Sequence, residues 1–219
     1  MLNLTLIIGN KNYSSWSLRP WILLKHFQIP FTEKRVALFT ETTAKALSAY
    51  NSNYKVPILK DGDFVVWDSL AILEYISETY LDGKGWPNEQ HARSFARSVS
   101  AEMHSGFTHV RSELPMNCRK KFEHIQLSDA AEREVERIKT LWRQCRSQFG
   151  QNGQWLFGEY SIADAMFAPI SLRFESYNIP LVDVEQAYLQ NVLAQPSIIE
   201  WITAGAAEKE IIAQGEVGV

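Results

Sequence analysis

Apolar runs and turn residues alternate along the first eighty residues of the chain. Residues 2 to 8 are mainly apolar and end at Gly9-Asn10, which is typical of a buried strand. A second apolar run, from residue 18 to residue 27, is long enough for a buried helix and stops before Pro30. Residues 31 to 38 can form another strand. The pattern therefore predicts a strand, a helix and a second strand.

The segment that follows predicts a short helix, a hairpin and a closing helix. The helix covers residues 43 to 50, and two short strands, residues 56 to 59 and 64 to 67, flank a turn at Asp61-Gly62. Another helical pattern begins after Asp68-Ser69. A βαβ unit followed by a helix, a hairpin and a helix is the layout of a thioredoxin-like domain with a mixed four-stranded sheet.

Helical patterns dominate the remainder of the chain. Helices are predicted near residues 88–114 and 129–149, and shorter ones from Ser161, near Val184 and after Pro196. Residues 81 to 88 contain two glycines and a proline and are predicted to be a linker. We expect an α/β domain over residues 1–81 and an all-α domain over residues 88–219.

A Ser-x-x-Asp motif, Ser161 to Asp164, begins one of these helices. In a capping box, the serine hydroxyl and the acidic side chain each accept a hydrogen bond from a backbone N–H of the first helical turn. We therefore expect Asp164 to support folding and to take no part in catalysis.

The composition excludes several function classes. The chain has 219 residues, 46% of them hydrophobic, and a net charge of -3, so neither a nucleic acid nor an anionic membrane is expected as a partner. Its two cysteines, Cys118 and Cys145, lie outside any metal-binding spacing, and neither a disulfide framework nor a metal site is expected. With no secretory pattern at the N-terminus, the expected location is cytoplasmic.

Two segments carry the candidate chemistry. One is Tyr13-Ser14-Ser15-Trp16-Ser17-Leu18-Arg19, and the other is Val56-Pro57 with Asp68-Ser69. Each places the N-terminus of a helix at the end of a strand, where backbone N–H groups and the helix dipole attract anions such as thiolates and carboxylates.

These motifs resemble those of the cytosolic glutathione transferases. The Ser14-Ser15-Trp16 stretch resembles the Ser-Ser-Cys motif of the zeta class and, more loosely, the serine-dependent theta-like classes. Val56-Pro57 is similar to the family's cis-proline turn, and Asp68-Ser69 to its acidic residue and serine. The capping box at Ser161 also matches, so the resemblance covers nearly the whole chain. Residues 101–107 and 114–117 resemble a bacterial-type subgroup.

The resemblance implies a thiol-activating site. Glutathione would be the co-substrate, and its thiol, with a pKa near ~8.5, must become a thiolate to attack. Ser14 is expected to stabilise the sulfur, with Ser15 beside it or beside the peptide backbone; Tyr13 is the alternative sulfur partner, and Ser17 is expected to be a helix N-cap. Trp16 replaces the cysteine of the zeta motif, which removes the nucleophile that thiol-transfer reactions require.

The rest of the glutathione site follows from the same resemblance. A cis Val56-Pro57 bond would let the Val56 backbone pair with the cysteinyl part of the ligand. Lys55 could reach the glycine carboxylate. Asp68 is expected to bind the ammonium group, and Ser69 the γ-glutamyl carboxylate.

The electrophile is expected to bind between the domains. The candidate residues are Met103, His104, Phe107 and Arg111, and the last three are spaced i, i+3 and i+7 on the predicted helix 88–114, so they would share one face. A histidine and an arginine in an apolar surrounding favour a substrate with an anionic or polar group.

We therefore expect a homodimeric glutathione transferase that conjugates glutathione to a small electrophile, in detoxification. Three alternatives stay open at this point. They are a glutathione-dependent cis-trans isomerase of the maleylacetoacetate type, a glutathione peroxidase-like activity, and a non-catalytic interaction or regulatory module with the same fold.

Overall fold

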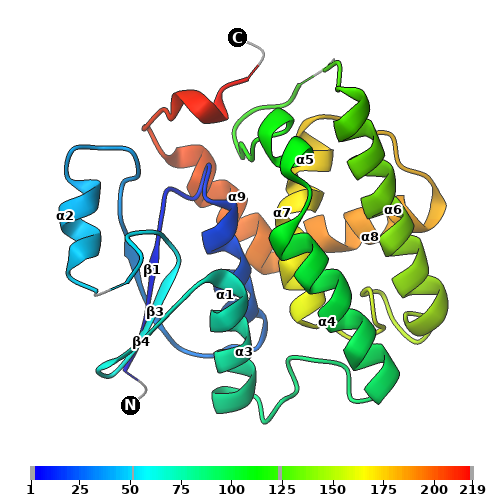
Figure 1. The fold of residues 1–219 in the computed structure, drawn as a ribbon, viewed down its shortest axis with the longest axis horizontal. Coiled ribbons are helices and arrows are strands. Elements are labelled where there is room, and N and C mark those ends of the chain that lie inside the picture. The colour runs from blue at the N-terminus through cyan, green and yellow to red at the C-terminus, as the bar shows by residue number, and fades with distance from the viewer. Residues whose placement is uncertain (1–2, 51, 123–124, 218–219) are drawn as a thin grey trace.

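The first eighty residues form a mixed four-stranded sheet. In this computed structural model, residues 3–50, 52–122 and 125–217 are described (Figure 1). The strands are β1 Leu4–Ile8, β2 Thr32–Arg35, β3 Ile58–Asp61 and β4 Phe64–Trp67, in the order β2-β1-β3-β4. β1 pairs in parallel with β2 and antiparallel with β3, and β3 pairs antiparallel with β4. The predicted thioredoxin-like sheet is confirmed.

Helices make up most of the chain outside these four strands, both within the first eighty residues and after them. They are α1 Ser15–His26, α2 Thr43–Ser48, α3 Ser69–Tyr80, α4 Gln90–Ser105, α5 Thr108–Glu113, α6 Asp129–Phe149, α7 Ile162–Ser176, α8 Asp183–Leu193 and α9 Pro196–Ala207, with a short 3-10 turn at Ala213–Gly215. Figure 1 shows the sheet and α2 on one side, the bundle of α4 to α8 on the other, and α1 between them. The predicted all-helical second half is confirmed.

The central strand β1 is buried on both faces because its side chains alternate between two clusters. Leu6 and Ile8 face the main core, which continues through α1 into the helical bundle. Ile7 faces a smaller cluster with Leu47 and Ile58, on the side covered by α2. A single core therefore joins the sheet to the bundle and fixes α1 between them.

Helix α1 begins three residues earlier than the sequence pattern predicts. It starts at Ser15, with Ser14 at the N-cap position, so Ser17 lies in the first turn and the expectation that it caps the helix is wrong. The apolar pattern could not reveal this start, because the first turn contains two serines that are nonetheless buried. The earlier start brings Ser15 to the N-terminal end of the helix dipole.

The helix predicted over residues 88–114 is two helices. α4 ends at Ser105, Gly106 follows in an extended conformation, and Phe107 has a φ of 59° before α5 begins. A Cβ at Gly106 would lie 2.9 Å from the carbonyl oxygen of Glu102, so the chain turns where a side chain would clash. The prediction that His104, Phe107 and Arg111 share one helical face is therefore wrong.

The capping box at the start of α7 is confirmed. The Asp164 carboxylate accepts hydrogen bonds from the Ser161 N–H at 2.9 Å and from the Leu156 N–H at 3.0 Å. Asp164 is only 1% exposed, and burial raises the pKa of its carboxyl to about 6 against these hydrogen bonds. Its role is to join the 156–161 loop to α7.

Candidate functional site

The loop of residues 10–14, which we call the serine loop, connects β1 to α1 and carries Ser14. The Ser14 hydroxyl donates to Ser17 Oγ at 2.7 Å, and Ser17 Oγ also accepts the N–H of Gly9 at 3.1 Å. In this arrangement the hydroxyl proton of Ser14 is already used within the protein. Ser14 therefore stabilises the turn that leads into α1.

Ser15 has the opposite pattern. Its Oγ accepts a hydrogen bond from Nη2 of Arg173 at 3.2 Å, and no acceptor for its own proton occurs among the described residues. A cation bound to the oxygen makes the remaining O–H a stronger donor. The Ser15 hydroxyl can thus donate to an anion at the N-terminus of α1.

Arg173 is a site residue that the sequence analysis missed. It lies on α7, 158 positions from Ser15, and it is 5% exposed. Its other guanidinium contacts are main-chain oxygens, of Leu114 and, at 3.3 Å, of Arg111, and its buried Nε has no partner in the described part of the chain. A single arginine within the apolar sequence of α7 is the signal that could have revealed it.

Trp16 is enclosed by cationic side chains. The Cζ atoms of Arg19 and Arg111 lie 4.2 Å and 4.6 Å from the centre of its ring. The His104 ring packs edge-on at a centroid distance of 5.5 Å. Trp16 thus links α1 to α4 and α5 through cation–π contacts, which favour guanidinium groups.

The three arginines give this region a surplus of positive charge. Burial, together with repulsion from Arg111 and Arg173, holds the pKa of the Arg19 guanidinium well below its usual value. Burial and repulsion from Arg111 lower the pKa of Arg173 to about 9, and burial lowers that of Arg111. Most of their hydrogen bonds go to neutral carbonyl oxygens, such as Met166 O for Arg19 and Gly106 O for Arg111. An anion bound beside Trp16 would relieve this repulsion.

Asp68 and His104, which the sequence analysis assigned to two different sites, contact each other. Asp68 caps α3, where its Oδ1 accepts the N–H groups of Leu70 at 2.9 Å and Ala71 at 3.3 Å. Its Oδ2 lies 2.7 Å from Nε2 of His104. The buried Ser69 accepts a hydrogen bond from Arg19 at 3.4 Å. The two predicted ligand sites are therefore joined across the domains.

The remaining predicted glutathione contacts precede β3. The Val56-Pro57 bond is cis, as predicted. Val56 is half-buried beside the buried Pro57, and Lys55 is exposed. Val56 thus lies just before the start of β3, and because Ile58 pairs with Trp67, this end of β3 is next to the end of β4, which Asp68 and Ser69 follow.

The four predicted electrophile contacts do not converge. His104 and Arg111 both reach Trp16, and the Met103 sulfur lies 3.7 Å from Nη2 of Arg111. Phe107 is buried and lines a different, shallow cavity with Gly106 and His109. Only three of the four therefore belong to the region of Ser15 and Trp16.

Neither thiol has a recorded contact with Ser15 or Trp16 in the described part of the chain. Cys145 is buried in α6, and Cys118 is partly buried after α5, where its Sγ contacts the carbonyl oxygen of Lys11 at 3.6 Å. Burial raises the pKa of the Cys118 thiol to about 12 and raises that of Cys145 as well. Within the described residues, no group of three or more histidine, cysteine or acidic residues is arranged for a metal ion.

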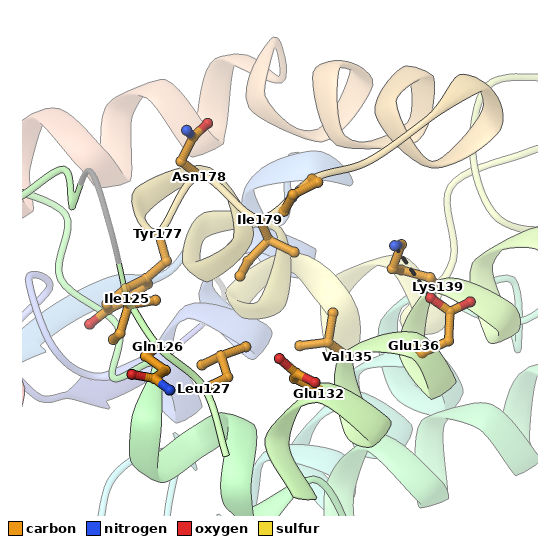
Figure 2. Close-up of a pocket in the computed structure, with 11 residues that line it drawn as sticks. Ile125, Gln126, Leu127, Glu132, Val135, Glu136, Lys139, Tyr177, Asn178 and Ile179 are labelled. Atoms are coloured by element: carbon orange, nitrogen blue, oxygen red, sulfur yellow. Dashed lines mark ion pairs between the residues drawn. The ribbon is translucent and has the colours of Figure 1, made fainter. Parts of the chain in front are cut away.

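A cavity of about 910 Å³ is lined by α6 and by the segments before α6 and after α7, and no residue of the serine loop lines it. Figure 2 shows that Ile125 to Leu127, α6 and the turn after α7 line it, and that Lys139 pairs with Glu136. It contains none of the predicted site residues. No helix in the described part of the chain is both long and apolar enough to cross a membrane.

Comparisons with known proteins match the N-terminal part most clearly. Residues 13–79 match the family of glutathione S-transferase N-terminal domains. Dichloromethane dehalogenase of Methylorubrum extorquens is 42% identical over 59 residues, which are 26% of this chain and 20% of that protein. A probable maleylacetoacetate isomerase of Caenorhabditis elegans is 34% identical over 92 residues, or 42% of each chain. The matches thus span less than half of these relatives.

Solved structures match over most of the chain. A glutathione transferase homolog from Burkholderia with bound glutathione superposes with a TM-score of 0.70 at 22% identity, covering 93% of this chain and 98% of the other. Glutathione S-transferase unclassified 2 from Bombyx mori has a TM-score of 0.73 at 18% identity, covering 93% and 94%. At these identities the likeness establishes the fold.

Proposed function

We propose that this chain, as a member of the glutathione transferase superfamily, activates the thiol of glutathione for attack on a small electrophile. Glutathione is then the co-substrate. The same proposal includes three features that the resemblance implies. They are a homodimer, a cytoplasmic location and a domain division at residues 81–88.

The ligand would lie along the N-termini of α1 and α3. Asp68 would bind its ammonium group, Ser69 and the end of α3 its γ-glutamyl carboxylate, and the Val56 backbone its cysteinyl unit. Lys55 would reach the glycine carboxylate. In this pose the sulfur comes to the start of α1, where Ser14 and Ser15 lie.

Ser15 is the serine that we assign to the sulfur. The observation that carries this assignment is the hydrogen bond from Arg173 to Ser15 Oγ, which leaves the hydroxyl proton for the ligand. Lowering the thiol pKa by roughly two units requires about 2.7 kcal/mol. A charge-assisted hydrogen bond together with the dipole of α1 supplies an energy of that order. Ser14 then holds the turn, and Trp16 forms the wall next to the sulfur.

Binding of glutathione tests the proposal directly. Calorimetry on the wild type is expected to give a dissociation constant in the micromolar to millimolar range, and the ultraviolet absorbance of the bound thiolate should titrate well below ~8.5. S-methylglutathione, which has no ionisable thiol, should bind without this absorbance. A wild type that does not bind glutathione would exclude the enzyme and favour a non-catalytic module.

The electrophile is proposed to carry an anionic group. Arg111 is half-buried, contacts Trp16 and lacks an ion pair among the described residues. Together with Arg173 it would bind a carboxylate, because the planar N–H groups of a guanidinium match the two oxygens of a carboxylate. This charge also favours cis-trans isomerisation of an unsaturated carboxylate as a second candidate function.

Replacing Arg111 by methionine should reduce activity selectively. For an aryl halide that carries a carboxylate, kcat/KM is expected to fall roughly 10- to 100-fold, because one charge-assisted hydrogen bond is lost. The carboxamide counterpart of the same halide should change less than about threefold. Arg97→Met, at an exposed position of α4, provides the matched control. Equal losses with both halides would show that Arg111 does not bind the anionic group.

A further inference from the structure

The C-terminal segment after α9 packs against the serine loop. We propose that residues 208–216 hold this loop in its active geometry, with Tyr13 and Glu216 as positioning residues. The inference rests on the proposed function and assigns a role to a part of the chain that contributes no group to the site.

Glu208, directly after α9, binds the start of the loop. Its carboxylate accepts the backbone N–H of Lys11 at 2.8 Å and that of Asn12 at 3.1 Å. On the other side of the peptide, Trp201 Nε1 of α9 donates to the carbonyl oxygen of Lys11 at 2.9 Å. The polar groups of an irregular loop are thus satisfied by the C-terminal part of the chain.

Glu216 binds the end of the loop through a side chain. Tyr13 donates its hydroxyl to Oε1 of Glu216 at 2.5 Å, and Asn117 donates to the same oxygen at 3.1 Å. Lys120 pairs with the other carboxylate oxygen at 2.6 Å. Burial alone would raise the pKa of the Glu216 carboxyl, but hydrogen bonds from Lys120 and Tyr13 hold it below its usual value. Glu216 is therefore an ionised acceptor that keeps the Tyr13 hydroxyl away from the sulfur site.

Arg119 ties the beginning of the C-terminal segment to the same tyrosine. Its guanidinium donates to the Tyr13 hydroxyl, to the carbonyl oxygen of Glu208 at 2.6 Å and to that of Glu210 at 2.9 Å. Asn117 Nδ2 also donates to the carbonyl oxygen of Gly215 at 3.1 Å. The connector after α5 thus fastens the segment against the loop.

Close packing makes this contact specific. A Cβ at Gly215 would lie 2.4 Å from Cδ1 of Tyr13, so only glycine allows the segment to lie against the ring. On α9, a Cβ at Gly205 would lie 3.0 Å from the backbone nitrogen of Asn12. The loop therefore has little room to shift toward the C-terminal segment.

The position of Tyr13 determines that of the serines. The N–H groups of Tyr13 and Ser14 both donate to the carbonyl oxygen of Asn10, and the Ser15 N–H donates to that of Tyr13 at 3.0 Å. A displacement of the Tyr13 ring consequently moves the peptide that precedes Ser15. Because catalysis depends on sub-ångström placement, loosening this anchor should weaken thiolate stabilisation more than ligand binding.

Two conservative substitutions, Tyr13→Phe and Glu216→Gln, test the proposal. Each should lower kcat about 3- to 10-fold and raise the pKa of bound glutathione by about 0.5 to 1 unit. KM for glutathione should change less than about twofold, because the Asp68 and Ser69 contacts remain. Glu175→Gln, which breaks the exposed ion pair with Lys121, is the matched control. It should leave kcat and the pKa of bound glutathione unchanged.

The possible results separate the alternatives. If the melting temperature falls while kcat and the bound-thiol pKa stay at wild-type values, the segment is only structural and the proposal is wrong. If Tyr13→Phe changes the pKa and Glu216→Gln does not, Tyr13 itself contacts the sulfur. Should Glu216→Gln fail to fold, Gly215→Ala, which pushes on the Tyr13 ring, must show the same shift. If the wild-type protein forms no glutathione thiolate, the proposed function is wrong, whatever the two variants show.

Discussion

Ser15→Ala is expected to lower kcat/KM for glutathione conjugation about 100-fold, and Ser14→Ala about tenfold or less. The difference follows from the two hydroxyl protons. The Ser15 proton is available to the sulfur and is polarised by Arg173, whereas the Ser14 proton is donated to Ser17. Loss of a charge-assisted hydrogen bond of about 1.5–3 kcal/mol corresponds to roughly 10- to 100-fold in rate.

The bound-thiol pKa distinguishes the two serines independently of rate. In Ser15→Ala it should rise by about 1 to 2 units, and in Ser14→Ala by less than about 0.5 unit. Ser105→Ala, at an exposed position where the hydroxyl bonds only to its own helix, is the control. A larger effect at Ser14 than at Ser15 would restore the assignment that the zeta-like motif implies.

Asp164→Ala is expected to destabilise the fold by about 3 kcal/mol at pH 5. The substitution leaves the buried N–H groups of Leu156 and Ser161 without their acceptor, and each buried unsatisfied donor costs about 1–3 kcal/mol. It also removes the acidic half of the capping box of α7, a helix that is buried along nearly its whole length. Chemical denaturation followed by circular dichroism measures the change in the free energy of unfolding.

The loss of unfolding free energy caused by Asp164→Ala should become smaller as the pH rises. The folded-state pKa of Asp164 is raised to about 6 by burial, above its unfolded value near ~3.9. The folded state therefore binds the proton more tightly, and the stability due to this carboxyl is full below about pH 4 and declines as the pH passes 6. The difference between wild type and variant is thus expected to be smaller at pH 7.5 than at pH 5.

An exposed cap provides the comparison. Glu89 accepts the N–H groups of His91 and Ala92 at the start of α4, but it lies at the surface. Glu89→Ala should therefore cause a smaller loss than Asp164→Ala, and one that does not shrink between pH 5 and pH 7.5. Equal losses at the two caps would mean that burial contributes nothing at Asp164.

The sequence predicted helices and strands well where the spacing of hydrophobic residues and the position of turn-forming residues indicate the same element. Strand β1 and the hairpin of β3 and β4 at Gly62 follow from short apolar runs bounded by turn residues, whereas the core of β2, Thr32–Arg35, is polar and exposed. The start of α1 was missed because Ser15 and Ser17 are polar residues in a buried first turn. The break at Gly106 was missed because a single glycine is tolerated in many helices, and only the close approach to Glu102 determines that it ends this one.

The site was predictable only where its residues are adjacent in sequence. The serines, Val56-Pro57 and Asp68-Ser69 belong to local motifs, and the structure leaves them near helix and strand ends. Arg173 and Glu216 act over 158 and 203 positions, and nothing local identifies their partners. The contact of His104 with Asp68 likewise depends on how the two halves pack. Long-range polar pairs of this kind follow from the tertiary fold and not from a pattern.

The burial of both thiols has a consequence for the chemistry of the environment in which this protein can work. Oxidation by peroxide and exchange with glutathione disulfide both require an accessible thiolate, and the raised pKa values keep Cys118 and Cys145 protonated. Trp16, at the position where related motifs have a cysteine, offers no sulfur to either reaction. Under the proposed function, the two cysteine residues are therefore expected not to form mixed disulfides with glutathione.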